Sequence, residues 1–445
     1  MTTAQIAIPD QQVDFMPGFG EEQYSQLGVQ DEPELLRAKR EEAFRFYKNL
    51  PVPTNRTEEW RRTGPALFPF DSLKSLPQLK QAEYAGEGSW DKYFDVVVSI
   101  DDTSFSIHDR SGVLKKEVVF VLPLAEASIR FPDLVKKHLQ GQALPADMGK
   151  IEALNSAFWN IGLFIYIPAK TDLKKGILIK HQHQTSGAIL VPRLVAVVEE
   201  QSTAHITEHF LSVDDLSFMS ITSKELYVQQ AARLKIVTLK KWGNQSYHVA
   251  SDMARVEKDA QVDLVTFNTG GKVSKMKFGS DVAGKNSAAE LDGLFFGQDD
   301  QHFDQTTLQV HSSPDTYSRL LYKGVVKDKA HSVYQGVIQA KPGAIRVDAY
   351  QTNNNIVLND GARADTIPGL LIDADDLKCS HGATIGNLDE EQIFYLRSRG
   401  LSESEARRIV LIGFFEEVIE RIPQDFIRDH IHELINQKIL KEAED

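Results

Sequence analysis

A repeat of 14 residues, running from about residue 200 to residue 385, constrains the fold of this chain more than any other feature of its sequence. Short stretches in which apolar and polar side chains alternate, such as residues 261–267, are separated by turn-forming residues. The register slips by four residues at Gly361-Ala362 and resumes at Asp375-Asp376. Small pairs recur at intervals of 28 residues, as Thr203-Ala204, Ala231-Ala232, Asp259-Ala260 and Ser287-Ala288.

One strand and one turn every 14 residues leave no room for the crossover helices of ordinary parallel α/β sheets. This spacing is typical of a meander of hairpins or of a coiled solenoid of parallel strands. The 28-residue interval favours the solenoid, because stacked coils would repeat the same narrow corner. We therefore predict a mainly β chain built around a parallel solenoid.

Three regions are expected along the 445 residues. Residues 1–94 are predicted to form an N-terminal helical region with a loosely ordered start, its first 30 residues, and a helix capped by Asp31. Residues 95–386 form the β core, with a helical interlude at about 132–159. Residues 387–445 follow helical spacing, with caps at Asp389 and Ser402 and a wide apolar surface that packs inside the domain or receives another protein.

The composition excludes several classes of function. A net charge of −13 argues against nucleic-acid binding, which requires Lys and Arg to neutralise phosphates. The single cysteine excludes an internal disulfide and fits a reducing compartment. No apolar run reaches the ~18–20 residues that span a bilayer, and the first ten residues lack the features of a signal peptide. We expect a cytoplasmic protein that binds neither nucleic acid nor membrane.

The only cysteine, Cys379, is followed two positions later by His381. If residues 377–385 form a strand, both side chains lie on one face about 7 Å apart, where a thiolate and an imidazole can reach a soft metal centre. Two ligands are too few for an iron–sulfur cluster, which usually takes four, so a partner would have to supply the others. The same face carries apolar residues, which leaves open that Cys379 is a core thiol and His381 a hydrogen-bonded core histidine.

Other motifs carry weaker signals. Residues 279–286 nearly match a phosphate-binding P-loop, but Asn286 replaces the Ser or Thr that binds magnesium, and a strand follows instead of a helix. We therefore predict a turn there and no bound nucleotide. Three histidine pairs have no nearby ligand set at metal spacing, and surface or packing roles are expected for them: His181 with His183, His205 with His209, and His430 with His432.

Three runs carry a resemblance to a known family. Residues 153–168 contain Ala-Leu-Asn-Ser-Ala-Phe and Ile-Tyr-Ile-Pro, residues 378–384 are Lys-Cys-Ser-His-Gly-Ala-Thr, and residues 394–400 are Phe-Tyr-Leu-Arg-Ser-Arg-Gly. Together they resemble the SufB/SufD family, the scaffold subunits of the SUF iron–sulfur cluster assembly machinery, from about Glu32 to the C-terminal helices. The chain is similar to D subunits rather than B subunits, which have a His-Glu-Ala-Thr run here and further cysteines.

The resemblance implies a right-handed parallel β-helix between N-terminal and C-terminal helical regions. It implies a non-enzymatic subunit that pairs with SufB through the β-helix and docks the SufC ATPase through its C-terminal helices. A nascent iron–sulfur cluster would form transiently at the interface with SufB, where His381 faces a cysteine of that subunit and Cys379 is a less certain contributor. A homodimer of the isolated chain is left open.

Two other functions are weighed against this one. A β-helix enzyme that acts on acidic polysaccharides would need carboxylates clustered on neighbouring coils, whereas Asp263, Glu290 and Asp348 are scattered along the sequence. A structural adaptor with no metal role would differ from the cluster scaffold only in the behaviour of a His381 variant.

Overall fold

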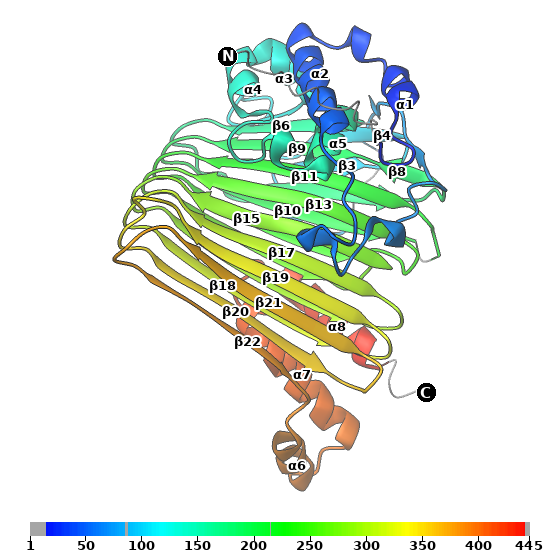
Figure 1. Cartoon of the computed structure of the whole chain (residues 1–445), viewed down its shortest axis with the longest axis vertical. Helices are drawn as coiled ribbons and strands as arrows, with labels where there is room; N and C mark the ends of the chain where they lie inside the picture. The colour runs from blue at the N-terminus through cyan, green and yellow to red at the C-terminus, as the bar shows by residue number, and fades with distance from the viewer. Residues whose placement is uncertain (1–14, 85–87, 214, 441–445) are drawn as a thin grey trace, which may run out of the picture.

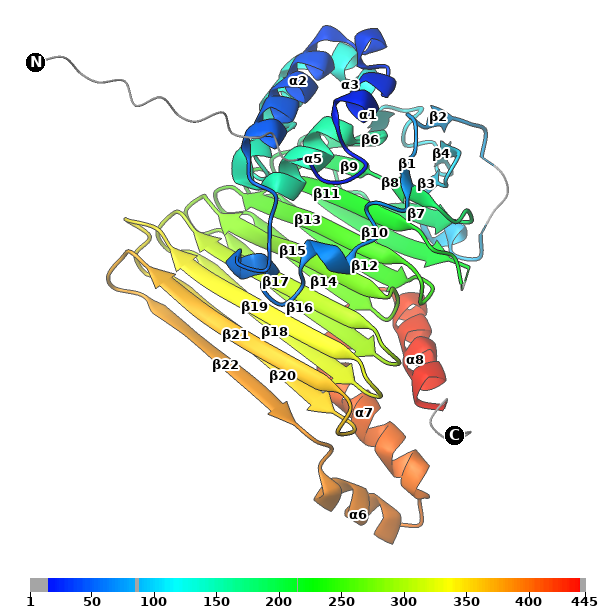
Figure 2. The same cartoon turned by 45° about the vertical axis from the view of Figure 1, so that its right-hand side comes forward.

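Two sheets of parallel strands wind around one apolar interior and form a β-helix of about eight turns at the centre of the molecule (Figure 1). The computed structural model describes residues 15–84, 88–213 and 215–440. Helices from the first third of the chain lie against one end and one side of the β-helix, and helices from the C-terminal region lie along another side (Figure 2). The predicted parallel solenoid with flanking helices is confirmed.

Sheet I holds eleven strands, and most of them are odd-numbered. Its path ends in an antiparallel pair, β5 with β6, and the short strand β1 joins it through β8. The strands are β1 (Lys74–Ser75), β5 (Phe120–Pro123), β6 (Ile161–Ile167), β8 (Ala188–Leu190), β9 (Pro192–Val198), β11 (Met219–Val228), β13 (Tyr247–Val256), β15 (Val273–Val282), β17 (His302–His311), β19 (His331–Ala340) and β21 (Arg363–Ile372).

Sheet II also holds eleven strands, in the order β2-β4-β3-β7 and then the even-numbered strands from β10 to β22. Only β3 and β4 pair antiparallel. The strands are β2 (Lys80–Gln81), β3 (Val96–Ile100), β4 (Ser104–Asp109), β7 (Ile177–His183), β10 (Thr203–Ser212), β12 (Arg233–Lys241), β14 (Gln261–Asn268), β16 (Ala288–Gly297), β18 (Tyr317–Val326), β20 (Asp348–Val357) and β22 (Lys378–Gly386).

Each coil of the β-helix turns at a corner where the chain adopts a left-handed backbone conformation. Ala231 and Asp259 have φ angles of 57° and 59°, just before β12 and β14, which confirms the corner expected from the repeat. The constant interval is wrong elsewhere. Tyr247 pairs with Val273, 26 positions later, whereas His331 pairs with Arg363, 32 positions later, because corner loops differ in length from coil to coil.

Apolar side chains from both sheets fill the interior of the β-helix, and alternate residues of each strand face inward. The outer face of sheet I packs against the N-terminal helices around residues such as Phe158 and Val197. The outer face of sheet II packs against the C-terminal helices through residues such as Phe267 and Phe415. Both lateral faces of the β-helix are therefore covered by helices over part of their area.

The N-terminal helices include the predicted interlude, with α4 and α5 at the expected places. Two expectations were wrong. Asp31 does not cap the long helix, because Pro33 takes the cap position. The stretch from residue 15 to residue 30 is packed, with Phe19 fully buried, whereas residues 1–14 of the predicted loose start lie outside the described residues. The helices are α1 (Glu21–Gln26), α2 (Glu34–Asn49), α3 (Leu124–Arg130), α4 (Pro132–His138) and α5 (Lys150–Phe158), with short 3₁₀ turns η1 (Val29–Asp31), η2 (Glu58–Trp60), η3 (Pro65–Leu67), η4 (Asp91–Tyr93) and η5 (Ala146–Met148).

Three helices follow the last strand: α6 (Glu390–Ser398), α7 (Glu403–Ile419) and α8 (Asp425–Leu440). The predicted caps are confirmed, because Asp389 accepts hydrogen bonds from two backbone N–H groups and Ser402 forms a capping box with Glu405. The apolar surface of α7 packs partly on sheet II, and α6 projects beyond the last coil (Figure 1). None of the described helices is both long and apolar enough to cross a membrane. The division into regions at 94/95 and 386/387 stays a prediction.

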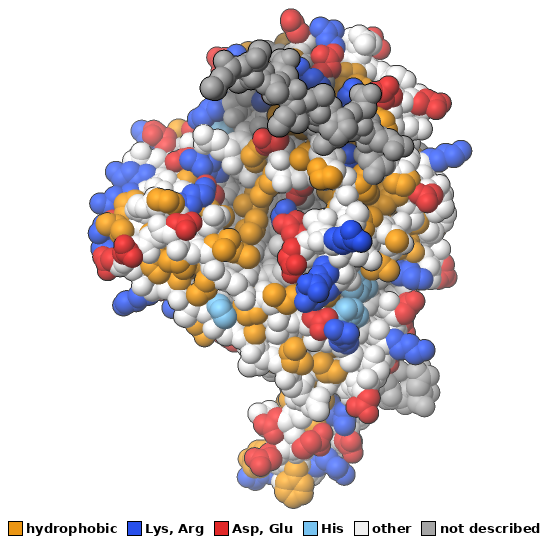
Figure 3. Space-filling view, viewed as in Figure 1, with side chains coloured by type: hydrophobic (Ala, Val, Ile, Leu, Met, Phe, Trp, Pro, Cys, Tyr) orange, Lys and Arg blue, Asp and Glu red, His pale blue; other side chains and the backbone are white. Residues whose placement is uncertain are grey.

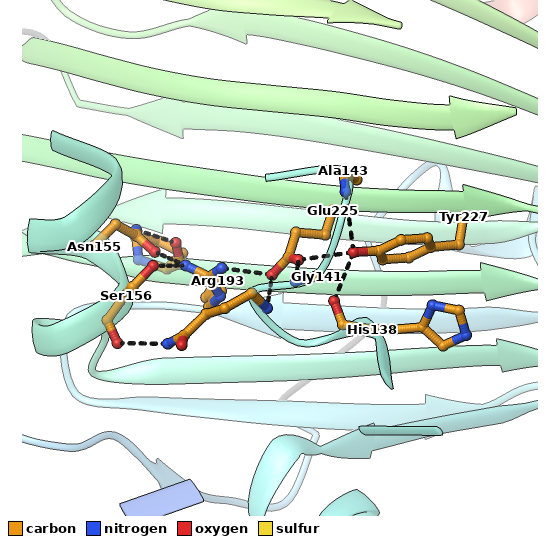
Figure 4. A network of polar contacts seen from close by, with 10 residues as sticks. His138, Gly141, Ala143, Asn155, Ser156, Arg193, Glu225 and Tyr227 are labelled. Carbon is orange, nitrogen blue, oxygen red and sulfur yellow. Dashed lines mark hydrogen bonds and ion pairs between the residues drawn. The ribbon is translucent and has the colours of Figure 1, made fainter. Parts of the chain in front are cut away.

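A buried polar network fastens the helical interlude to the outer face of sheet I (Figure 4). The guanidinium of Arg193 forms an ion pair with Glu225, and both side chains are fully buried. The Glu225 carboxylate also accepts hydrogen bonds from the backbone N–H groups of Gln140 and Gly141, each at 2.9 Å. Tyr227 donates to the carbonyl of His138 at 2.7 Å. One carboxylate on a strand therefore holds the loop that follows α4.

We expect Glu225→Ala to destabilise the chain by about 3–5 kcal/mol, because it leaves the buried Arg193 guanidinium without its counter-charge. The urea midpoint of the full-length chain measures this loss. Lys258→Ala is the control, since it removes an exposed ion pair with Asp259 whose loss costs at most about 1 kcal/mol. Equal midpoints for the two variants would contradict the role given to Glu225.

Candidate functional site

The site expected from the sequence lies on β22, the last strand of the β-helix. The strand predicted at residues 377–385 is present as Lys378–Gly386 and pairs in parallel with β20. No other strand in the described part of the chain pairs with its second edge, and sheet I likewise ends at β21. Unpaired strand edges are sites where another chain can add strands. The last coil therefore ends the β-helix with two open edges.

Cys379 and His381 share the inner face of β22. Cys379 is paired with Ala349 of β20 and packs with residues of the interior, and His381 is paired with Gln351. Residues two positions apart on a strand lie about 7 Å from each other. The structure thus brings the two side chains to one face, as the sequence predicted.

The inner face of the last coil is open. His381 is exposed, and Ile385, two positions further along the same face, is 48% exposed. In earlier coils the equivalent position is aliphatic and buried. From first coil to last, the inward row that ends at the site consists of Ile206, Ile236, Leu264, Leu291, Leu320, Gln351 and His381.

Cys379 is half-buried against a small apolar cluster that includes Ala340 and Val347. Burial raises the pKa of the thiol, and the negative charge of Asp348 raises it further. A raised pKa keeps the sulfur protonated near neutral pH, whereas metals bind the thiolate. In the chain by itself, Cys379 is therefore a poor ligand.

His381 offers a more accessible donor. No hydrogen bond to its imidazole comes from any residue that the structure describes. The described residues also contain no group of three or more His, Cys, Asp or Glu side chains placed to hold a metal ion. Cys379 and His381 could thus be at most part of a ligand set.

The other histidines take packing roles. His183 is buried and 2.7 Å from Asp102, and His181 is buried 3.5 Å from Glu208. His209 stacks on Trp90, and burial lowers the pKa of His209 to about 3. His430 and His432 diverge as expected. His430 faces the Trp90 ring, whereas His432 is 2.9 Å from Glu416.

The sequence analysis missed a charged cluster inside the β-helix. Lys224 forms ion pairs with Glu208 and with Asp252, and all three are buried. Burial alone would lower the pKa of Lys224, but the two carboxylates outweigh it and hold the pKa above its usual value. The only sequence signal is a charged residue at an inward position of an otherwise apolar strand pattern.

The two rejected motifs are accounted for. Residues 279–286 span the end of β15 and a turn before β16, so the predicted turn is confirmed. Asp263 and Glu290, expected to be scattered, lie on paired positions of neighbouring coils. Asp263 lies 3.7 Å from Lys235 and Glu290 lies 4.0 Å from Arg421, so each carboxylate has a cationic partner within the chain.

Comparisons with known proteins point to one family. The model described as "SUF system FeS cluster assembly, SufBD core domain" matches residues 181–414, and the model "SufBD protein N-terminal region" matches residues 93–179. The first of these includes β22 and all of α6.

Three relatives illustrate the extent of the similarity. An iron–sulfur cluster assembly SufBD family protein of Mycobacterium tuberculosis (strain ATCC 25618 / H37Rv) is 32% identical over 397 residues, 87% of this chain and 89% of the relative. Iron–sulfur cluster assembly protein SufD of Bacillus subtilis (strain 168) is 26% identical over 418 residues, 92% and 95% of the two chains. SufD of Escherichia coli (strain K12) is 32% identical over 240 residues, 54% and 57% of the two chains.

The environment of Cys379 predicts how it reacts with iodoacetamide. Alkylation should be slow near pH 7 and should accelerate as the pH rises toward the raised pKa of the thiol, because only the thiolate reacts. Asp348→Asn removes the charge that disfavours the thiolate, so the rate at pH 8 should increase by roughly two- to fivefold. Mass spectrometry follows the reaction at the single cysteine. A rate that Asp348→Asn leaves unchanged would show that burial alone sets the pKa.

Proposed function

The chain belongs to the SufBD family of the SUF iron–sulfur cluster assembly system, and from this premise we propose that it is a non-catalytic scaffold subunit of the SufD type. Its cargo is a nascent iron–sulfur cluster that is held transiently and shared with a second subunit. A cytoplasmic location fits the single cysteine and its reduced state.

The open last coil is the observation that carries this proposal. Inner-face side chains that should be buried, such as Leu370 and Ile385, are exposed there, and the edges of β21 and β22 are unpaired. A partner with the same fold can continue both sheets and cover these side chains. SufB is the partner proposed for this end, and a second copy of the chain can occupy it in isolation.

His381 is proposed to supply a ligand at this interface. It lies on the inner face that the partner would cover, and it has no competing hydrogen bond from the described residues. Clusters usually take four protein ligands, so a cysteine of SufB must contribute. Cys379 becomes a ligand only if closure of the interface lowers the pKa of its thiol.

A second surface is proposed to dock the SufC ATPase. A groove of about 840 Å³ lies between the ends of β20 and β22 and the helices α6 and α7. Phe394 and Tyr395 of α6 are 74% and 56% exposed, and Ile409 of α7 is also exposed. Hydrophobic side chains gather at the lower tip of the molecule, where Figure 1 places α6 (Figure 3). The turn at residues 279–286 supports a chain that binds no nucleotide itself.

We expect His381→Ala to lower the iron and sulfide content of the complex assembled with SufB and SufC by roughly tenfold, because the cluster loses a ligand. Folding should be unchanged, since the side chain is exposed. Ser380→Ala is the matched control, because Ser380 is an exposed neighbour on the opposite face of β22. Iron and sulfide are measured on the anaerobically purified complex. Wild-type contents in His381→Ala would overturn the assignment.

We expect the double variant Phe394→Ala/Tyr395→Ala to weaken binding of the SufC ATPase by tenfold or more, because exposed aromatic residues often dominate interface energies. Pairing with SufB should persist, since the open last coil is untouched. Ile129→Ala, an equally exposed apolar residue on α3, is the control. Co-purification of wild-type amounts of the ATPase with the double variant would exclude this surface.

A further inference from the structure

Gln351 lies in the row directly beneath His381, and its carboxamide has no partner. The two residues are paired in register on β20 and β22, with side chains on the inner face. Gln351 is 0% exposed, and neither its Nε2 nor its Oε1 has a hydrogen-bond partner among the described residues. Buried amides almost always have partners, because an unmade hydrogen bond costs free energy. The missing partner must lie in the space around the end of this side chain.

A glycine on the opposite sheet makes room for the carboxamide. A Cβ atom at Gly336 of β19 would lie 2.4 Å from Nε2 and 2.5 Å from Oε1 of Gln351. The amide therefore reaches across the interior from sheet II to sheet I. Gly336 is paired with Pro368 of β21, as Gln351 is paired with His381 of β22. The carboxamide thus lies one coil below the open last coil.

The last coil offers two polar groups toward this space. One is the His381 imidazole, and the other is the hydroxyl of Thr366 on β21, whose buried oxygen also lacks a partner. A buried water needs two to four polar partners, and these two groups together with Gln351 meet that need. The three side chains can therefore form one hydrogen-bonded set, directly or around one water.

We propose that Gln351 is a positioning residue for His381. Its amide oxygen accepts a hydrogen bond from the inward N–H of the imidazole, directly or through one water. The lone pair of the other ring nitrogen then faces the open end. Metal-binding histidines commonly give their second ring nitrogen to such a partner, which fixes the tautomer. The inference rests on the proposed role of His381 and adds the residue that orients its ring.

Another interior glutamine provides a matched control. Gln305 of β17 is also 0% exposed with both amide atoms unpartnered. Its row leads to Tyr334 and then to Thr366, so a full coil separates it from the last one. If buried carboxamides served only to pack the interior, Gln305 and Gln351 would be equivalent in their effect on His381.

The test measures the tautomer of His381 in the full-length chain, without metal. Long-range ¹⁵N–¹H spectra of histidine-labelled protein at alkaline pH report the ratio of the two neutral tautomers, and His381→Asn assigns the signal. We expect one tautomer to dominate in the wild type. Gln351→Leu should change the ratio by about tenfold, the effect of one lost hydrogen bond. Gln305→Leu should leave it unchanged, and Gln351→Glu, which keeps an acceptor, should preserve the wild-type tautomer.

Gly336→Ala decides the matter if Gln351→Leu does not fold. The backbone of Gly336 is outside the left-handed region, and the added methyl group meets only the flexible end of Gln351, so the carboxamide must move. The ratio should change as in Gln351→Leu. An unchanged ratio in the folded variant, or an equal change in Gln305→Leu, would overturn the inference. Wild-type cluster content in His381→Ala would instead overturn the proposed function and leave the tautomer result standing.

Discussion

A ladder of parallel strands satisfies its backbone hydrogen bonds only from coil to coil, so every β-helix has to deal with its two ends. At the N-terminal end of this chain, the antiparallel pairs β3–β4 and β5–β6 continue the sheets beyond the first coils, and helices cover the surface above them. At the other end, the described strands stop at β21 and β22 and no helix covers their inner face. The unmet hydrogen bonds of these two strands are the constraint on which the candidate site depends.

The side-chain pattern changes where the ladder ends. The inward row is aliphatic from Ile206 to Leu320 and then becomes Gln351 and His381. Polar groups inside a protein are costly unless they are paired. The charged cluster around Lys224 meets that requirement with Glu208 and Asp252. Gln351 and His381 do not meet it within the described chain, which distinguishes a site that awaits a ligand from a cluster that is complete.

Much of the fold could be predicted because it repeats. The corner at Ala231, the strand that carries Cys379 and His381, and the caps at Asp389 and Ser402 all follow from local patterns. The pairing of coils could not be predicted, because intervals of 26 to 32 residues separate paired positions and an error of one residue turns a side chain to the other face. Gln351 is 30 positions from His381, so the sequence alone gave no sign that one lies beneath the other.

The two candidate ligands differ in how they depend on closure of the last coil. Burial and Asp348 keep the thiol of Cys379 protonated, whereas the imidazole of His381 is already accessible. A partner that covers the last coil gains the burial of side chains such as Ile385, and under the proposed function it also brings the missing ligands. Because both events occur on the same face, binding of the partner and formation of the cluster must favour each other by the same free energy. A chain with half of a ligand set and an open end therefore makes the cluster conditional on assembly.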